Sequence, residues 1–333
     1  MRLILGSHTA AVLAESNTGE TLCRVELPNP SFAALSGDRR FAYVASEDPD
    51  GPGMVHAFRV ADDRLEPHGT PRPSGGDQPC HVAVHPAGRF LLAANYGDGS
   101  VAALPIDGDG ALGDPSSVVA HSGGGPDPRR QSGPHAHQAI ADPDGRWVLV
   151  CDLGTDEVVI YRLDETRGVL ERHSSADFAP GQGVRHLAFS PDGDRVFAVA
   201  ELSSEFVACE WDGRRGVLTP VKSIDAFAPG DEPSARNYPS ATATSPDGRF
   251  VYFANRGHDS LAVVDAADFR LVGARPCGGR WPRDFCLTRD GRRLFAANEH
   301  SGDVVAFDVS GGRLAPGDAP KLELPGVTSV LEL

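Results

Sequence analysis

Short runs of alternating hydrophobic and polar residues recur along the chain, separated by polar turns rich in glycine and proline. Five copies align on a turn resembling Pro-Asp-Gly, and the first strand of each opens at one of five positions: Cys80, His137, Arg185, Ser240 and Arg283. A looser copy opens at Phe32. Alternation with a period of two predicts half-buried β-strands, and long helical patterns are absent. The pattern therefore predicts an all-β fold.

Each copy contains an alternating strand, the turn, a second strand rich in Phe, Val and Ala, a polar loop and a third strand. A fourth, less regular strand can follow, and the unit repeats roughly every 50 residues. Four strands at this spacing are typical of a β-propeller blade. Six units are visible, and pairing the strands near Leu3–Ile4 and Ala11–Leu13 with the C-terminal GVTSVLEL would add a seventh. We predict one domain, 1–333, forming a seven-bladed β-propeller; the alternative is a six-bladed ring with frayed ends.

The repeated turn is structural, because proline presets its first position and glycine accepts a positive φ. Two sets of residues on the opposite face of the disc are of more interest. Chain direction alternates between strands, so the openings of the first strands and the ends of the second strands should meet at one mouth of the central channel. The first set is Cys80, His137, Arg185, Ser240 and Arg283; the second is Tyr96, Leu153, Glu201, Arg256 and Glu299, with Asn95 and Asn255 beside it.

The two sets bring unlike residues to equivalent positions of the repeat. Three arginines, one histidine and two carboxylates around one funnel fit an anionic ligand and proton transfer. An electrostatically satisfied, water-filled channel is the alternative. A metal site is a further alternative, because His135 and His137 lie two residues apart and His186 could be a third ligand, but the phase of His186 points it away from the channel. We expect neither a metal nor another cofactor.

The composition of the chain limits the classes of molecule that it is expected to bind. The formal net charge is −15, which opposes binding to nucleic acid and to anionic membranes. The six cysteines are scattered without a C-x-x-C pair, which favours reduced thiols and a cytoplasmic location. The expected partner is a small anionic molecule, and we expect a monomer or a homodimer.

Several segments also resemble a known family. They are ANYGDGSV, PHAH, RHLAFSPDG, ELSS, PDGRFVYFANRGHDSLAV and PRDF, in this order along the chain. They are similar to the lactonase family of seven-bladed propellers, which contains 6-phosphogluconolactonases and carboxy-muconate lactonizing enzymes. The resemblance implies active-site residues at His137, Arg185, Glu201 and Arg256. The sequence departs from the family at Val184, Ala200 and the segment YPSATATSPDG.

The resemblance and the two sets together predict a metal-independent lactonase of carbohydrate metabolism, acting on 6-phosphogluconolactone in the pentose phosphate pathway. Arg185 and Arg256 would bind phosphate or polarise the lactone carbonyl, and His137 is favoured over Glu201 as the general base. Supporting substrate contacts are expected from Arg283, His135, Tyr96, Asn95, Asn255 and Glu299. The alternatives are a lactonizing enzyme acting on an unsaturated dicarboxylate and a non-catalytic binding platform.

Overall fold

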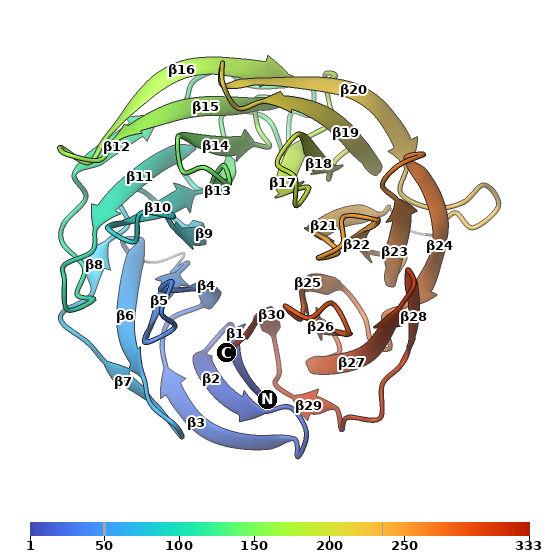
Figure 1. Cartoon of the computed structure of the whole chain (residues 1–333), viewed down its shortest axis with the longest axis horizontal. Helices are drawn as coiled ribbons and strands as arrows, with labels where there is room; N and C mark the ends of the chain where they lie inside the picture. Colours follow the sequence, from blue (N-terminus) through green and yellow to red (C-terminus); the bar gives the residue numbers. More distant parts are fainter. Residues whose placement is uncertain (49–50, 235) are drawn as a thin grey trace.

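Seven antiparallel sheets stand around a central axis in the computed structural model, which describes residues 1–48, 51–234 and 236–333 (Figure 1). The closing blade contains β1 (Arg2–Ser7), β2 (Ala10–Glu15), β3 (Glu20–Glu26) and β30 (Val327–Glu332). Blade 1 contains β4 (Pro30–Leu35), β5 (Phe41–Ser46), β6 (Met54–Val60), β7 (Leu65–Pro67) and β8 (Arg72–Pro73). Blade 2 contains β9 (Pro79–Val84), β10 (Phe90–Asn95), β11 (Ser100–Pro105) and β12 (Ser117–Ala120).

The remaining four blades follow the same order from the axis outward. Blade 3 contains β13 (Ala136–Ala141), β14 (Trp147–Asp152), β15 (Glu157–Asp164) and β16 (Val169–Asp177). Blade 4 contains β17 (Val184–Phe189), β18 (Arg195–Ala200), β19 (Glu205–Asp212) and β20 (Val217–Asp225). Blade 5 contains β21 (Tyr238–Thr244), β22 (Phe250–Arg256), β23 (Ser260–Asp265) and β24 (Arg270–Pro276). Blade 6 contains β25 (Pro282–Leu287), β26 (Arg293–Asn298), β27 (Asp303–Ser310), β28 (Arg313–Pro316) and β29 (Leu322–Glu323).

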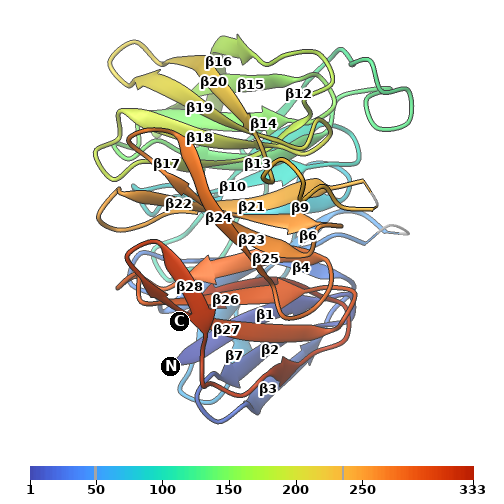
Figure 2. The ribbon, with the colours of Figure 1, turned by 90° about the vertical axis from the view of Figure 1, so that its right-hand side faces the viewer.

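The closing blade joins the two ends of the chain. Strand β30 pairs with β1 in antiparallel register, with Leu5 opposite Val330 and Ile4 opposite Leu331. The termini lie close together in both views (Figures 1 and 2). Strand β1 pairs with β2 on one edge, and β30 covers its other edge. The pairing therefore removes one open edge from each of the two strands. The predicted seven-bladed ring is confirmed, and the six-bladed alternative is wrong.

The hydrophobic core lies between neighbouring blades rather than at the axis. Phe206 of blade 4 stacks on Phe253 of blade 5 with ring centroids 4.5 Å apart. Inside the blades, the glycines of the five repeated turns all have φ between +67° and +75°, as the Pro-Asp-Gly pattern predicts: Gly88, Gly145, Gly193, Gly248 and Gly291. None of the described residues forms a helix, so no segment among them could cross a membrane as one.

Candidate functional site

A β-bulge interrupts the innermost strand of every blade at the same place. At each opening the register against the second strand shifts, so that one residue, or two in β21, is left without a ladder partner. A bulge re-aims the side chain that it carries. The residues at these seven positions, called here the bulge ring, are Ser31, Cys80, His137, Arg185, Ser240, Arg283 and Thr328.

The bulge ring divides into two kinds of residue. Its four small members bind backbone of the next blade, whereas the side chains of His137, Arg185 and Arg283 reach into a cavity that Cys80 also lines. The small members therefore tie the blades together around the axis. Their hydroxyl or thiol groups donate to carbonyl oxygens as follows: Ser31 to Pro79 at 3.2 Å, Cys80 to His137 at 3.4 Å, Ser240 to Pro282 at 2.7 Å and Thr328 to Pro30 at 3.5 Å.

A second ring lies at the ends of the second strands, on the same mouth of the channel. Most of these residues follow the strand directly, and their N–H groups donate to the loop that leads into the first strand. Glu201 N–H donates to Gly183 at 2.8 Å, and Glu299 N–H donates to Trp281 at 3.0 Å. The second ring comprises His8, Glu47, Tyr96, Leu153, Glu201, Arg256 and Glu299.

Two carboxylates of blade 3 hold the loops that lead into the first strands of blades 3 and 4. Asp152 Oδ1 accepts from the N–H of His135 at 2.8 Å, two residues before His137. Asp156 Oδ1 accepts from the N–H of Gly183 at 2.5 Å, two residues before Arg185. Gly183 has φ +61° at this turn, a conformation that favours glycine. The backbones that carry His137 and Arg185 are thus fixed before any ligand binds.

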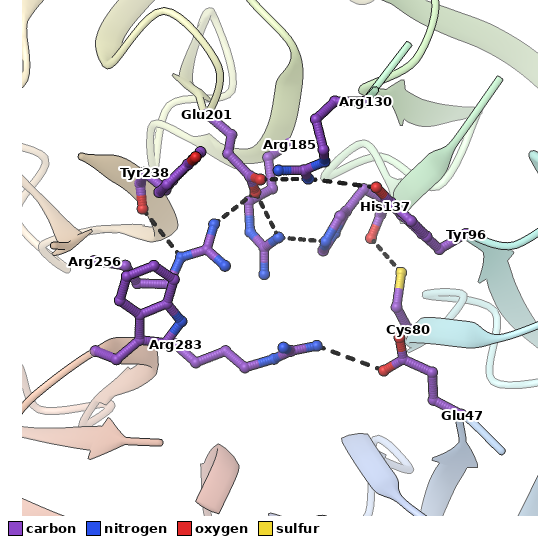
Figure 3. Close-up of a pocket in the computed structure, with 11 residues that line it drawn as sticks. Glu47, Cys80, Tyr96, Arg130, His137, Arg185, Glu201, Tyr238, Arg256 and Arg283 are labelled. Atoms are coloured by element: carbon purple, nitrogen blue, oxygen red, sulfur yellow. Dashed lines mark hydrogen bonds and ion pairs between the residues drawn. The ribbon is translucent and has the colours of Figure 1, made fainter. Parts of the chain in front are cut away.

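The two rings meet at a cavity of about 380 Å³ at the channel mouth (Figure 3). This volume lies within the usual range of small-molecule sites, about 300–1,000 Å³. Its wall is built from six blades and two connecting loops. The lining residues are Glu47, Cys80, Tyr96, Arg130, His137, Arg185, Glu201, Tyr238, Arg256, Trp281 and Arg283.

Glu201 is held by three guanidinium groups. Arg130 Nη2 binds Oε1 at 2.6 Å, while Arg185 Nη1 and Arg256 Nη2 bind Oε2 at 2.8 and 2.6 Å. Burial alone would raise the pKa of Glu201, but the attraction of the three arginines outweighs it and lowers the pKa. Glu201 is therefore a firmly ionised carboxylate that organises the arginines and is a weak base.

His137 faces Arg185 in the same network. Arg185 Nη1 donates to His137 Nε2, and in the described part of the chain His137 Nδ1 has no hydrogen-bond partner. Burial, followed by the nearby positive charges, lowers the pKa of His137 well below its usual range. The imidazole is neutral, and its accepting lone pair is already occupied. This geometry disfavours the expected role of His137 as general base and fits a positioning role toward Arg185 instead.

One terminal guanidinium nitrogen of Arg185 and one of Arg256 remain free to bind a ligand. Arg185 Nη2 and Arg256 Nη1 have no protein partner within the described ranges, and both guanidinium groups point into the cavity (Figure 3). Burial lowers the pKa of Arg256 to about 10, so it is still cationic at neutral pH. With both lining glutamates ionised, the four lining arginines leave an excess of two positive charges in a chain of net charge −15. The cavity is thus electrostatically suited to an anion.

The opposite side of the cavity has a different balance of charge. Arg283 lies 3.5 Å from Glu47 Oε2 and 3.5 Å from Glu299 Oε2. Glu299 also contacts His8 Nε2 through Oε1 at 2.9 Å. Figure 3 shows Arg283 and Glu47 facing Arg256 and Arg185 across the cavity. One wall therefore presents free cationic donors and the other a carboxylate.

Several residues expected to touch substrate lie elsewhere. Asn95 and Asn255 are completely buried in their blades, where Asn95 Nδ2 donates to Ser100 Oγ and Asn255 Nδ2 donates to the Ala226 carbonyl. His135 stacks on Tyr96 outside the cavity wall, and Glu299 lies behind Arg283. The adjacent residues Asn95 and Tyr96 point in different directions, and only Tyr96 lines the cavity. Ser240 and Leu153 are also absent from the cavity wall.

Four lining residues were missed by the sequence reasoning. Glu47 stands ten positions after Gly37, as Glu201 stands ten after Pro191, so applying the same rule to the looser repeat would have found it. Tyr238 is the first residue of β21, and Trp281 lies directly before β25. Arg130 lies on the loop between β12 and β13, which has no equivalent in the repeat and gives no sequence signal.

The three histidines considered as metal ligands do not form a metal site. His135 Nδ1 binds the carbonyl of Tyr96 at 2.8 Å, and His137 Nε2 faces Arg185. His186 packs against His137 with ring centroids 5.2 Å apart. Across residues 1–48, 51–234 and 236–333, no group of three His, Cys, Asp or Glu side chains is placed to hold a metal ion.

Known proteins resemble this chain over nearly its whole length. The sequence model of the family described as "Lactonase, 7-bladed beta-propeller" matches residues 10–331. A Bacillus subtilis protein named 6-phosphogluconolactonase is 36% identical over 87% of this chain and 83% of its own length. A crystal structure from Lactobacillus plantarum, covering 99% of both chains, has a TM-score of 0.90 at 29% identity. The Pseudomonas aeruginosa periplasmic gluconolactonase has a TM-score of 0.86 at 27% identity, covering 99% and 98%.

Proposed function

We propose that this chain, which belongs to the lactonase family of seven-bladed β-propellers and is a lactonase, hydrolyses 6-phosphogluconolactone to 6-phosphogluconate in the cavity at its channel mouth. The similarity to the Bacillus subtilis protein supports a sugar lactone as substrate. The surplus of positive charge on the cavity wall supports the phosphorylated form over the uncharged sugar lactone.

The observation that carries the proposal is the pair of unpaired guanidinium nitrogens in the cavity. Arg185 Nη2 and Arg256 Nη1 are held in place because Glu201 binds the other arm of each arginine. A lactone carbonyl oxygen becomes an oxyanion when water adds to the carbonyl carbon. Preorganised hydrogen-bond donors at that position stabilise the oxyanion and so lower the barrier. Removing one such donor by mutagenesis typically raises the barrier by about 3–4 kcal/mol.

The phosphate needs a second contact away from the reacting carbonyl. Arg130 stands at the outer part of the cavity, with its side chain 32% exposed and anchored to Glu201 and to the hydroxyl of Tyr96. Its remaining N–H groups are available to an incoming dianion. A phosphate bound there would fix the distance between the phosphate end and the carbonyl end of the substrate.

Steady-state hydrolysis tests this function. Purified protein, after dialysis against a chelator, should open 6-phosphogluconolactone faster than the spontaneous reaction, with 6-phosphogluconate measured through a coupled dehydrogenase. We expect a higher kcat/KM for this substrate than for unphosphorylated gluconolactone. Equal background rates with and without protein, on both lactones, would refute the proposal.

A cytoplasmic location and a monomeric or dimeric state remain predictions. The six free cysteines favour a reducing compartment. One solved relative is described as periplasmic, so fractionation of the native cells is the appropriate test. Size-exclusion chromatography with light scattering tests the oligomeric state.

A further inference from the structure

Lactone hydrolysis requires a base to take a proton from the attacking water, and the two residues expected for this task are poorly suited to it. The charge of the Glu201 carboxylate is balanced by ion pairs with three arginines, which makes it a weak base. The Nε2 lone pair of His137 already accepts from Arg185. Burial raises the pKa of the Cys80 thiol, so it is not an ionised nucleophile at neutral pH. The lining residues include one further carboxylate, that of Glu47.

We propose that Glu47 is the general base of the reaction, and this inference rests on the proposed lactonase function. Glu47 lines the cavity, and its Oε2 is buried without a hydrogen-bond partner among the described residues. The only charged contact of this oxygen in those residues is Arg283 at 3.5 Å, beyond normal hydrogen-bond length. An accepting oxygen in this state can be satisfied by a water bound in the cavity.

The backbone around Glu47 is fixed independently of its side chain. Glu47 N–H donates to the carbonyl of Asn29 at 2.9 Å, and Asn29 Nδ2 donates back to the Glu47 carbonyl at 2.9 Å. Asn29 takes φ +39° to make this clamp. A carboxylate on a rigid support can hold water in one orientation, as general-base catalysis requires.

Comparison with Glu299 distinguishes a catalytic carboxylate from a counter-ion. Both glutamates lie 3.5 Å from Arg283, but only Glu47 lines the cavity. Burial raises the pKa of Glu47, despite the opposing charge of Arg283. Burial also acts on Glu299, but Arg283 and His8 outweigh it and lower its pKa. Two carboxylates on one arginine are thus pushed toward different protonation behaviour, which is typical of acid–base sites.

The reaction then balances as follows. Ionised Glu47 removes a proton from water while the water oxygen bonds to the lactone carbonyl carbon. The carbonyl π electrons move to its oxygen, which Arg185 and Arg256 stabilise. Collapse of this tetrahedral species re-forms the carbonyl and breaks the bond to the ring oxygen. The ring oxygen leaves with the proton held by Glu47 and becomes a hydroxyl, and the new carboxylic acid then ionises in solvent.

The groups around Glu47 determine how the rate depends on pH. Ser31, Arg185, Arg283, Glu299 and Cys80 face it from the neighbouring strands and loops. Because the raised pKa belongs to the base, kcat/KM should fall as the pH decreases through it. Asp284 could also cause the rate to depend on pH and needs a control, since burial raises its pKa to about 7. It lies in a small pocket next to the cavity.

The test compares three variants on 6-phosphogluconolactone, with spontaneous hydrolysis subtracted at each pH. Glu47→Gln should lower kcat about 10²–10⁴-fold, the usual contribution of a general base, with little change in KM and without the acidic limb. Glu299→Gln disturbs the same arginine but should keep the acidic limb, and Asp284→Asn should keep it too. Circular dichroism establishes that each variant is folded.

The outcomes separate the two proposals. If the wild-type protein hydrolyses the lactone while Glu47→Gln keeps its rate and its acidic limb, Glu47 is not the base. If Glu47→Gln and Glu299→Gln lose the same activity and both keep the limb, Glu47 only holds Arg283, and the inference is again overturned. A wild-type protein inactive on every lactone would instead remove the proposed function on which the inference rests.

Discussion

The carboxylate of Glu201 should stabilise the fold as well as organise the site, and Glu201→Gln removes its charge while keeping its size. The substitution leaves Arg130, Arg185 and Arg256 without their shared counter-ion. Removing one partner of a buried ion pair typically costs about 3–5 kcal/mol. At about 2.1 cal/mol/K per residue, unfolding 333 residues carries an entropy of about 0.7 kcal/mol/K. The midpoint of thermal unfolding should therefore fall by about 4–7 °C.

Differential scanning calorimetry measures this shift, and added phosphate gives a second readout. The variant cavity carries one more positive charge, so inorganic phosphate should raise its unfolding midpoint more than that of the wild type, compared with chloride at equal ionic strength. Glu157→Gln is the matched control, because Glu157 forms a surface pair with Arg172 at 3.3 Å and should cost about 0–1 kcal/mol. An unchanged midpoint in Glu201→Gln, with no added response to phosphate, would refute the claim that Glu201 organises the arginines.

Three further predictions concern the site and the ring. Arg256→Ala and His137→Ala should each lower kcat/KM for 6-phosphogluconolactone at least about tenfold with an unchanged circular dichroism spectrum, because one removes an oxyanion donor and the other the partner of Arg185. Arg130→Ala should raise KM for the phosphorylated lactone more than for gluconolactone, and an equal effect on both would contradict a phosphate contact. Deleting residues 327–333 removes β30 and exposes the edge of β1, so the truncated chain should aggregate or lose its cooperative thermal transition; a monodisperse, cooperatively folding product would contradict closure by this strand.

The architecture was predictable because each copy of the repeat marks its own strands and turns in the sequence. Alternating residues fix which face of a strand is buried, and each turn glycine marks where a strand reverses. Counting from that turn placed Glu201 and Arg256 at the mouth, and the structure brings both to one cavity with His137 and Arg185. The count also placed Tyr96 there correctly.

The remainder of the site depends on features that alternation does not encode. Asn95 and Tyr96 are adjacent, and a register uncertain by one residue cannot separate a side chain in the blade from one in the cavity. Glu47 belongs to the repeat whose turn has Arg39 at φ +59° where the other copies have glycine, which hid the equivalence. Arg130 lies outside the repeat, so only the folded chain shows that it reaches Glu201.

The central claim is that separate blades deliver Arg185 and Arg256 to one cavity where they bind the substrate. A crystal structure of the protein with the product 6-phosphogluconate tests it most directly. We predict that a carboxylate oxygen of the product will lie within hydrogen-bond distance of Arg185 Nη2 and Arg256 Nη1, with the phosphate near Arg130. Product density confined to another surface, with this cavity occupied only by solvent, would contradict the account.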